Sequence, residues 1–84
     1  APVDGFRALK RYIDAQTPVN TPRSRIRVQF VVGTNGQLSD FQVLSSSNIA
    51  LNNFAIELLQ NGPAWEVTEG DAPLLVVYTV KLKG

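Results

Sequence analysis

Apolar and polar residues alternate over two stretches of the chain, with the period of a strand that buries one face. The first stretch runs from Arg25 to Val32, and its regularly spaced apolar residues are Ile26, Val28, Phe30 and Val32. A second strand is expected over about Gln37–Leu44. A third is expected over Leu74–Leu82, which is rich in β-branched and aromatic residues.

The residues between the first two strands predict a hairpin. Asn35-Gly36 is a favoured pair for a type I′ turn, in which both central residues have positive φ. In the second strand, the step from Leu38 to Phe41 breaks strict alternation. We interpret this step as a β-bulge or a local twist.

Helical spacing appears in two other segments. Phe6, Leu9 and Ile13 share one face of a helix expected over about Gly5–Ala15, with Asp4 as a plausible N-cap. The segment that follows, 17–23, contains two prolines and is expected to be a loop.

The second helix has a fuller apolar face, at positions i, i+3, i+4, i+7 and i+8. Ser47 or Asn48 begins it, with Asn52 as a competing cap, while Gly62 and Pro63 end it. Its apolar residues are Leu51, Phe54, Ala55, Leu58 and Leu59.

The order helix, strand, strand, helix, strand predicts one α+β domain over residues 1–84. The simplest topology is a three-stranded antiparallel sheet of order 2-1-3, with both helices on one face. Strands two and three are then both edges. On the open face, Leu75 and Val77 are expected near Val31, and Lys81 and Lys83 near Arg25 and Arg27.

Composition excludes several classes of function. The chain has no His and no Cys, and its net charge is +1. The sequence therefore predicts no enzyme activity, no cofactor and no metal site. Ser45-Ser46-Ser47 could suggest a nucleophile, but the chain has no His to act as its general base. Glu66, Glu69 and Asp71 lack the ligand spacing of a calcium loop.

The basic residues and the single Trp have plain structural interpretations. Aromatic residues that could stack on bases are not interleaved with the basic set, so we expect a solvated face and no binding of nucleic acid. The basic set is Arg23, Arg25, Arg27, Lys81 and Lys83. Trp65 is expected to pack in or at the rim of the core.

Five motifs, in this order, resemble the C-terminal domain of the TonB energy-transducer family, in the form seen in Bacteroidetes-type bacteria. They are SRIRVQFVV at 24–32, the Asn35-Gly36 turn with the strand that ends in LSS at 44–46, LNNFA at 51–55, PAW at 63–65 and the strand that follows Pro73. The likeness spans about residues 5–82. The chain departs from the family at two positions. Thr17 precedes Pro18 where the family has Tyr before the Pro, and Val67 stands where the family has Pro.

The resemblance implies a periplasmic domain of a parent protein anchored in the inner membrane, of which this chain is a fragment. Such a domain grips the N-terminal TonB-box peptide of outer-membrane transporters by β-strand addition, and an ExbB–ExbD-type motor couples the parent to the proton gradient. The implied peptide-binding residues are Leu74, Leu75, Val76, Val77, Tyr78, Thr79, Val80, Lys81 and Leu82. The loop implied to contact the partner is Gln16, Thr17 and Pro18.

Two other interpretations stay open from the sequence. The domain can be an accessory interaction module of another cell-envelope protein, such as a sensor or a lipoprotein, with no role in transport. It can also form a homodimer through the same edge strand.

Overall fold

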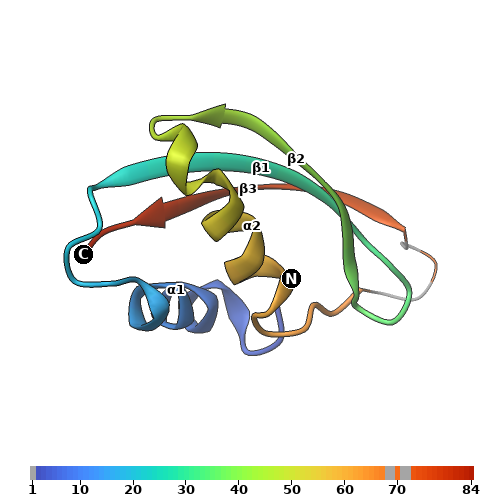
Figure 1. Ribbon diagram of the computed structural model, residues 1–84. Helices are drawn as coiled ribbons and strands as arrows, with labels where there is room; N and C mark the ends of the chain where they lie inside the picture. Colours follow the sequence, from blue (N-terminus) through green and yellow to red (C-terminus); the bar gives the residue numbers. More distant parts are fainter. Residues whose placement is uncertain (1, 68–69, 71–72) are drawn as a thin grey trace.

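A single antiparallel sheet with two helices on one of its faces forms the molecule (Figure 1). The computed structural model describes residues 2–67, 70 and 73–84. The strand order is β2-β1-β3, with β1 at Ser24–Val32, β2 at Leu38–Ser46 and β3 at Leu74–Leu82. The predicted α+β fold and the 2-1-3 order are confirmed.

Helix α1 (Gly5–Gln16) and helix α2 (Asn52–Gln60) lie on the same side of the sheet and leave its other face open (Figure 1). Among the helices of the described residues, none is long and apolar enough to cross a membrane.

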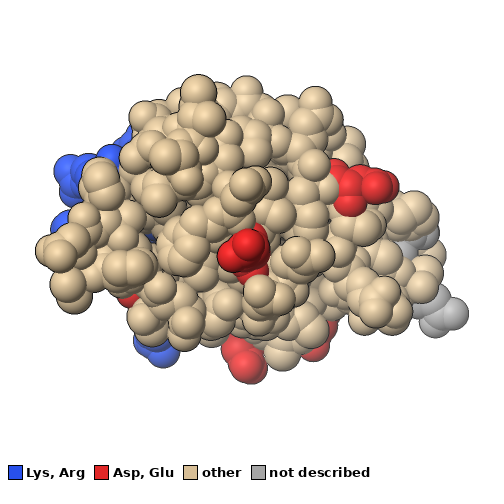
Figure 2. All heavy atoms as spheres, in the orientation of Figure 1, with Lys and Arg blue, Asp and Glu red and all other residues tan. Residues whose placement is uncertain are grey.

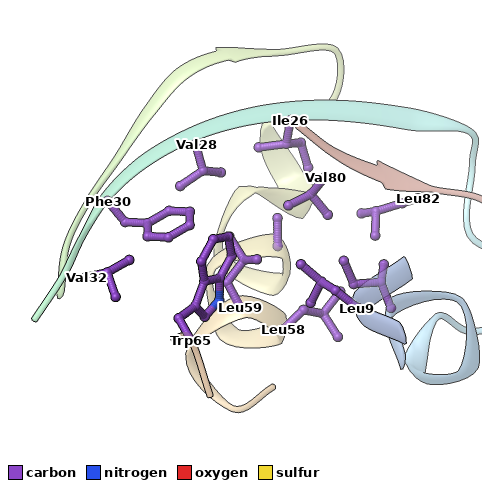
Figure 3. Close-up of a cluster of buried hydrophobic side chains, with 12 residues drawn as sticks. Leu9, Ile26, Val28, Phe30, Val32, Leu58, Leu59, Trp65, Val80 and Leu82 are labelled. Atoms are coloured by element: carbon purple, nitrogen blue, oxygen red, sulfur yellow. The ribbon is translucent and has the colours of Figure 1, made fainter. Parts of the chain in front are cut away.

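The core lies between this covered face and the helices. The inward residues of β1 are all fully buried, as the alternation in the sequence predicts. Phe30 is at the centre, with ring centroids 5.2 Å from Trp65 and 5.7 Å from Phe41. Trp65 is buried as expected, and Figure 3 shows its ring beside Phe30 and Leu59. A core of this kind stabilises the fold mainly by removing apolar surface from water.

The hairpin turn between β1 and β2 differs from the predicted type I′. Gly36 has φ +80°, but Asn35 does not have positive φ, and the Gly36 N–H donates to the Gly33 carbonyl at 2.9 Å. One left-handed glycine after the turn is the pattern of a type I turn with a G1 bulge. Asn35 instead accepts a hydrogen bond from the Gln37 N–H through Oδ1.

The predicted helix caps are only partly correct. Asp4 precedes α1 as expected, but it is left-handed, with φ 67°, and its side chain makes no capping bond. A 3-10 turn at Ile49–Leu51 follows Asn48, and α2 begins at Asn52. The Asn52 side chain accepts a hydrogen bond from Ser46 Oγ, so this Asn connects α2 to the end of β2.

Candidate functional site

Strand β3 presents a long, regular edge. It pairs with β1 without a register shift, from Ser24 opposite Leu82 to Val32 opposite Leu74. Within the described residues, no strand pairs with its other edge. An edge of this kind leaves backbone N–H and C=O groups available to another chain.

The direction of these backbone groups follows from the ends of β1. Arg25 accepts from the Ser47 N–H at 3.0 Å, and the Gly33 N–H donates to Gln37 at 2.9 Å, so odd-numbered residues of β1 face β2. The backbone N–H and C=O groups of the even-numbered residues of β1 then point toward β3. These residues lie opposite the even-numbered residues of β3, whose backbone groups point back toward β1. The backbone groups that point away from the sheet belong to Leu75, Val77, Thr79 and Lys81.

The outer edge of β2 is a poorer template. Its register with β1 shifts twice, between Arg27 and Val28 and between Gln29 and Val31. The second shift contains Asp40, which has φ 55°, and lies at the break in alternation that predicts a bulge. Bulges twist an edge and interrupt its ladder, so β3 is the better edge for strand addition.

On the covered face of the sheet, helix α1 lies next to the edge strand β3. The Phe6 ring stacks on Tyr78, with centroids 6.0 Å apart and an interplanar angle of 13°. It also forms a T-shaped pair with Trp65, with centroids 5.8 Å apart. Phe6 shares a helical face with the buried Leu9 and Ile13, but its side chain is 51% exposed. Phe6 and Tyr78 therefore form an aromatic surface beside the open edge.

This aromatic surface predicts an alkaline loss of stability. Burial raises the pKa of Tyr78 above its usual value near 10; the charge of Lys10 lowers it and that of Asp14 raises it by smaller amounts. The raised pKa contributes stability that is complete below the unfolded-state pKa and is lost as pH rises through the folded-state value. We expect urea denaturation from about pH 9 to 11 to show a smaller loss for Tyr78→Phe than for the wild type. Equal losses would contradict this assignment.

The predicted partner loop lies at the end of β3. The Gly84 N–H donates to the Thr21 carbonyl at 3.1 Å, which joins the loop to the residues that follow the strand. Thr17 is buried, and its Oγ1 donates to the Ile13 carbonyl at 2.6 Å. Gln16 and Pro18 are exposed, so these two, and not Thr17, are available to a partner.

On the open face, the structure places most of the expected neighbours together. Leu75 lies opposite Val31, and Lys81 lies opposite Arg25. Arg27 lies opposite Thr79, diagonal to Lys81, and Lys83, which follows the end of β3, lines one depression together with Arg25 and Lys81.

The remaining candidates have structural roles or lie outside the described residues. Ser46 and Ser47 bond to Asn52 and to the Arg25 N–H, which connects the end of β2 to its neighbours. Glu66 is described and exposed, whereas Glu69 and Asp71 lie outside the described residues. In the part of the chain that the structure describes, no group of acidic residues is arranged to hold a metal ion.

Sequence reasoning did not find the position of α1 beside the free edge. Lys10 and Arg11 are off the helical face shared by Phe6, Leu9 and Ile13, but this spacing cannot show that Lys10 approaches β3, because the two segments are far apart in the chain. Comparison with protein-family models, curated proteins and solved structures gave no significant match.

Proposed function

We propose that this domain binds an extended peptide along the free edge of β3, in the manner of a TonB-type energy transducer. The observation that carries the proposal is the uninterrupted pairing of β3 on one side together with its unpaired edge on the other. The resemblance of the five sequence motifs to the TonB family also supports the proposal. The peptide in this proposal is the N-terminal segment of an outer-membrane transporter.

Strand addition suits such a task physically. The outward N–H and C=O groups of β3 supply ladder hydrogen bonds whatever the peptide sequence, and side chains beside the ladder supply selectivity. A ladder of several bonds also resists a pull along the strand, because the bonds share the load. A transducer that pulls on its partner needs this resistance to force.

A proline at an outward-facing position tests this proposal. Thr79→Pro removes an outward N–H while it leaves the pairing with β1 to the even-numbered residues. We expect the affinity for N-terminal transporter peptides to fall by about tenfold or more, since the peptide loses a backbone partner and meets the proline ring. Isothermal calorimetry or an NMR titration measures the effect.

Two controls make the result specific. Thr79→Ala removes the side chain and keeps the N–H, so its affinity is expected to stay within about threefold of the wild type. Tyr78→Pro interrupts the ladder to β1, and is expected to destabilise the fold. An unchanged affinity in a folded Thr79→Pro protein would refute strand addition at this edge.

A further inference from the structure

Four exposed cationic side chains gather where β1 begins and β3 ends. Arg25 lies directly opposite Lys81 in the ladder between the two strands. Arg23 comes directly before β1, and Lys83 comes directly after β3. Figure 2 shows Lys and Arg gathered at this end of the molecule, at the left of the view. These four residues, Arg23, Arg25, Lys81 and Lys83, are called the cationic cluster below.

The position of Arg25 opposite Lys81 is unfavourable for the fold by itself. The backbone groups of odd-numbered β1 residues point toward β2, so these two residues form a non-hydrogen-bonded pair, the kind that brings side chains closest. Like charges directly opposite each other destabilise a sheet. The residues around the pair on the same face do not offset the repulsion, since they are Arg27, Thr79 and Ser45. An anion held between the two cations would remove it.

The chain itself supplies little negative charge to the cationic cluster. All four of its side chains line one depression, together with Lys10 and Asp14 of α1. In the part of the chain that the structure describes, Asp14 is the only acidic residue in this lining, and its carboxylate is 3.0 Å from the Lys10 ammonium. Five cations and one carboxylate leave a net charge of +4 here. The whole chain has a net charge of only +1, so the excess is local.

The depression has the size of a site for a small molecule. Its volume is about 560 Å³. Of the described residues that line it, none is aromatic, and the apolar side chain of Leu82 is buried. An apolar group would therefore find little surface here, and a nucleobase would find no ring on which to stack. These features suit a compact molecule that is recognised through its charge.

Hydrogen bonds within the chain hold the backbone around the cationic cluster. Ser24 Oγ donates to the Pro22 carbonyl at 2.9 Å, on either side of the first cation of the cluster. The Gly84 N–H donates to the Thr21 carbonyl at 3.1 Å, which joins the end of β3 to the loop before β1. The positions that carry the cations are therefore fixed before any anion binds, which lowers the entropic cost of binding.

From these observations we infer that the cationic cluster binds a compact anion that carries at least two phosphate groups. One phosphate group carries a charge of about −1.5 to −2 near neutral pH, so two of them nearly balance the four cations. The planar guanidinium groups of Arg23 and Arg25 match pairs of phosphate oxygens, and the two lysines add point charges. The inference does not depend on strand addition, because it uses side chains and no open backbone group of β3.

Calorimetric titration of the whole domain tests this inference with inorganic pyrophosphate and inorganic monophosphate at the same ionic strength. We expect pyrophosphate to bind about tenfold more tightly or better, because it contacts more of the cations at once. Its affinity should fall by about tenfold between ionic strengths of about 0.02 M and 0.3 M, since exposed charges are screened. Equal affinities for the two anions would overturn the inference.

Variants of the domain locate the effect. The double variant Arg25→Gln, Lys81→Gln should bind pyrophosphate about tenfold more weakly or worse. Arg7→Gln, Arg11→Gln is the matched control, since it removes the same charge from exposed positions of α1 that do not line the depression. An equal loss of affinity in the control would show that net charge alone attracts the anion, and would overturn the inference.

The stability of the same double variant gives a second measurement. Without an anion, Arg25→Gln, Lys81→Gln should unfold at a urea concentration no lower than the wild type, because it removes a repulsion. A marked loss of stability would assign these two cations a structural role, and would count against an anion site.

Vesicles distinguish the two sources of such an anion, a soluble molecule and a lipid headgroup. One set of vesicles contains a lipid with two phosphomonoester groups, and a second set has the same surface charge from phosphodiester lipids. Binding of pyrophosphate in solution supports a soluble source. Binding to the first set alone, with a loss in the double variant, supports a headgroup. A domain that binds neither pyrophosphate nor the first set would overturn the inference.

Discussion

Replacing Phe30 by Ala is expected to lower the free energy of unfolding by about 3–5 kcal/mol, the largest effect of any substitution proposed for this domain. Phe30 is 0% exposed and lies on the central strand. Its ring contacts both Trp65 and Phe41, so its removal leaves a cavity that neither neighbour can fill without moving. Small domains have total free energies of unfolding of about 5–15 kcal/mol, so this variant would be only marginally stable.

Urea denaturation, followed by the fluorescence of Trp65, measures this loss, because Trp65 is the single Trp and lies against Phe30. Phe30→Leu keeps most of the volume and should cost about 1–2 kcal/mol, which stays measurable if the Ala variant does not fold. Phe54→Ala is the matched control on the half-buried face of α2. A loss at Phe54 as large as that at Phe30 would contradict a core centred on β1.

Gly36→Ala is expected to cost about 2–4 kcal/mol, for two reasons that act together. Gly36 has φ +80°, a conformation that residues with a side chain rarely adopt. A Cβ atom at this position would also fall on the carbonyl oxygen of Trp65, which is backbone and cannot swing aside. The turn between β1 and β2 and the segment at Trp65 would have to separate.

Gly5→Ala isolates the first reason, the positive φ, because no clash occurs there. Gly5 has a similar φ of +86°, but a Cβ there would meet no atom within 4 Å. We expect this control to lose only the conformational part, about 1–2 kcal/mol. Thermal unfolding of both variants gives the comparison, since each kcal/mol shifts the midpoint by about 4–8 °C in a domain of this size. Equal shifts would show that the contact with Trp65 is not tight.

Local patterns were enough to predict the elements and their order. The alternation from Ile26 to Val32 identifies the central strand and its buried face, and the bounds of the last strand agree with the predicted Leu74–Leu82. The sheet order follows because a hairpin pairs two strands and the helix after it returns the chain to the other side of the first. These features depend on neighbours in sequence.

Features that depend on distant contacts were missed. The Asn35-Gly36 pair suits a type I′ turn, but the turn formed here places only Gly36 at positive φ, where the backbone of Trp65 packs against it. Phe6 has the spacing of a core residue, yet it stays half exposed because it stacks on Tyr78 of the edge strand β3. The groove between α1 and β3, which Lys10 and Lys81 line, likewise joins segments far apart in the chain, and periodicity gives no sign of it.

The central claim, that β3 accepts a peptide along its free edge, is tested most directly by amide hydrogen exchange with and without a bound peptide. We expect new protection at Leu75, Val77, Thr79 and Lys81, whose N–H groups point outward. Little change is expected at Val76, Tyr78 and Val80, which pair with β1. Peptide binding that leaves the odd-numbered amides of β3 unprotected would contradict the claim.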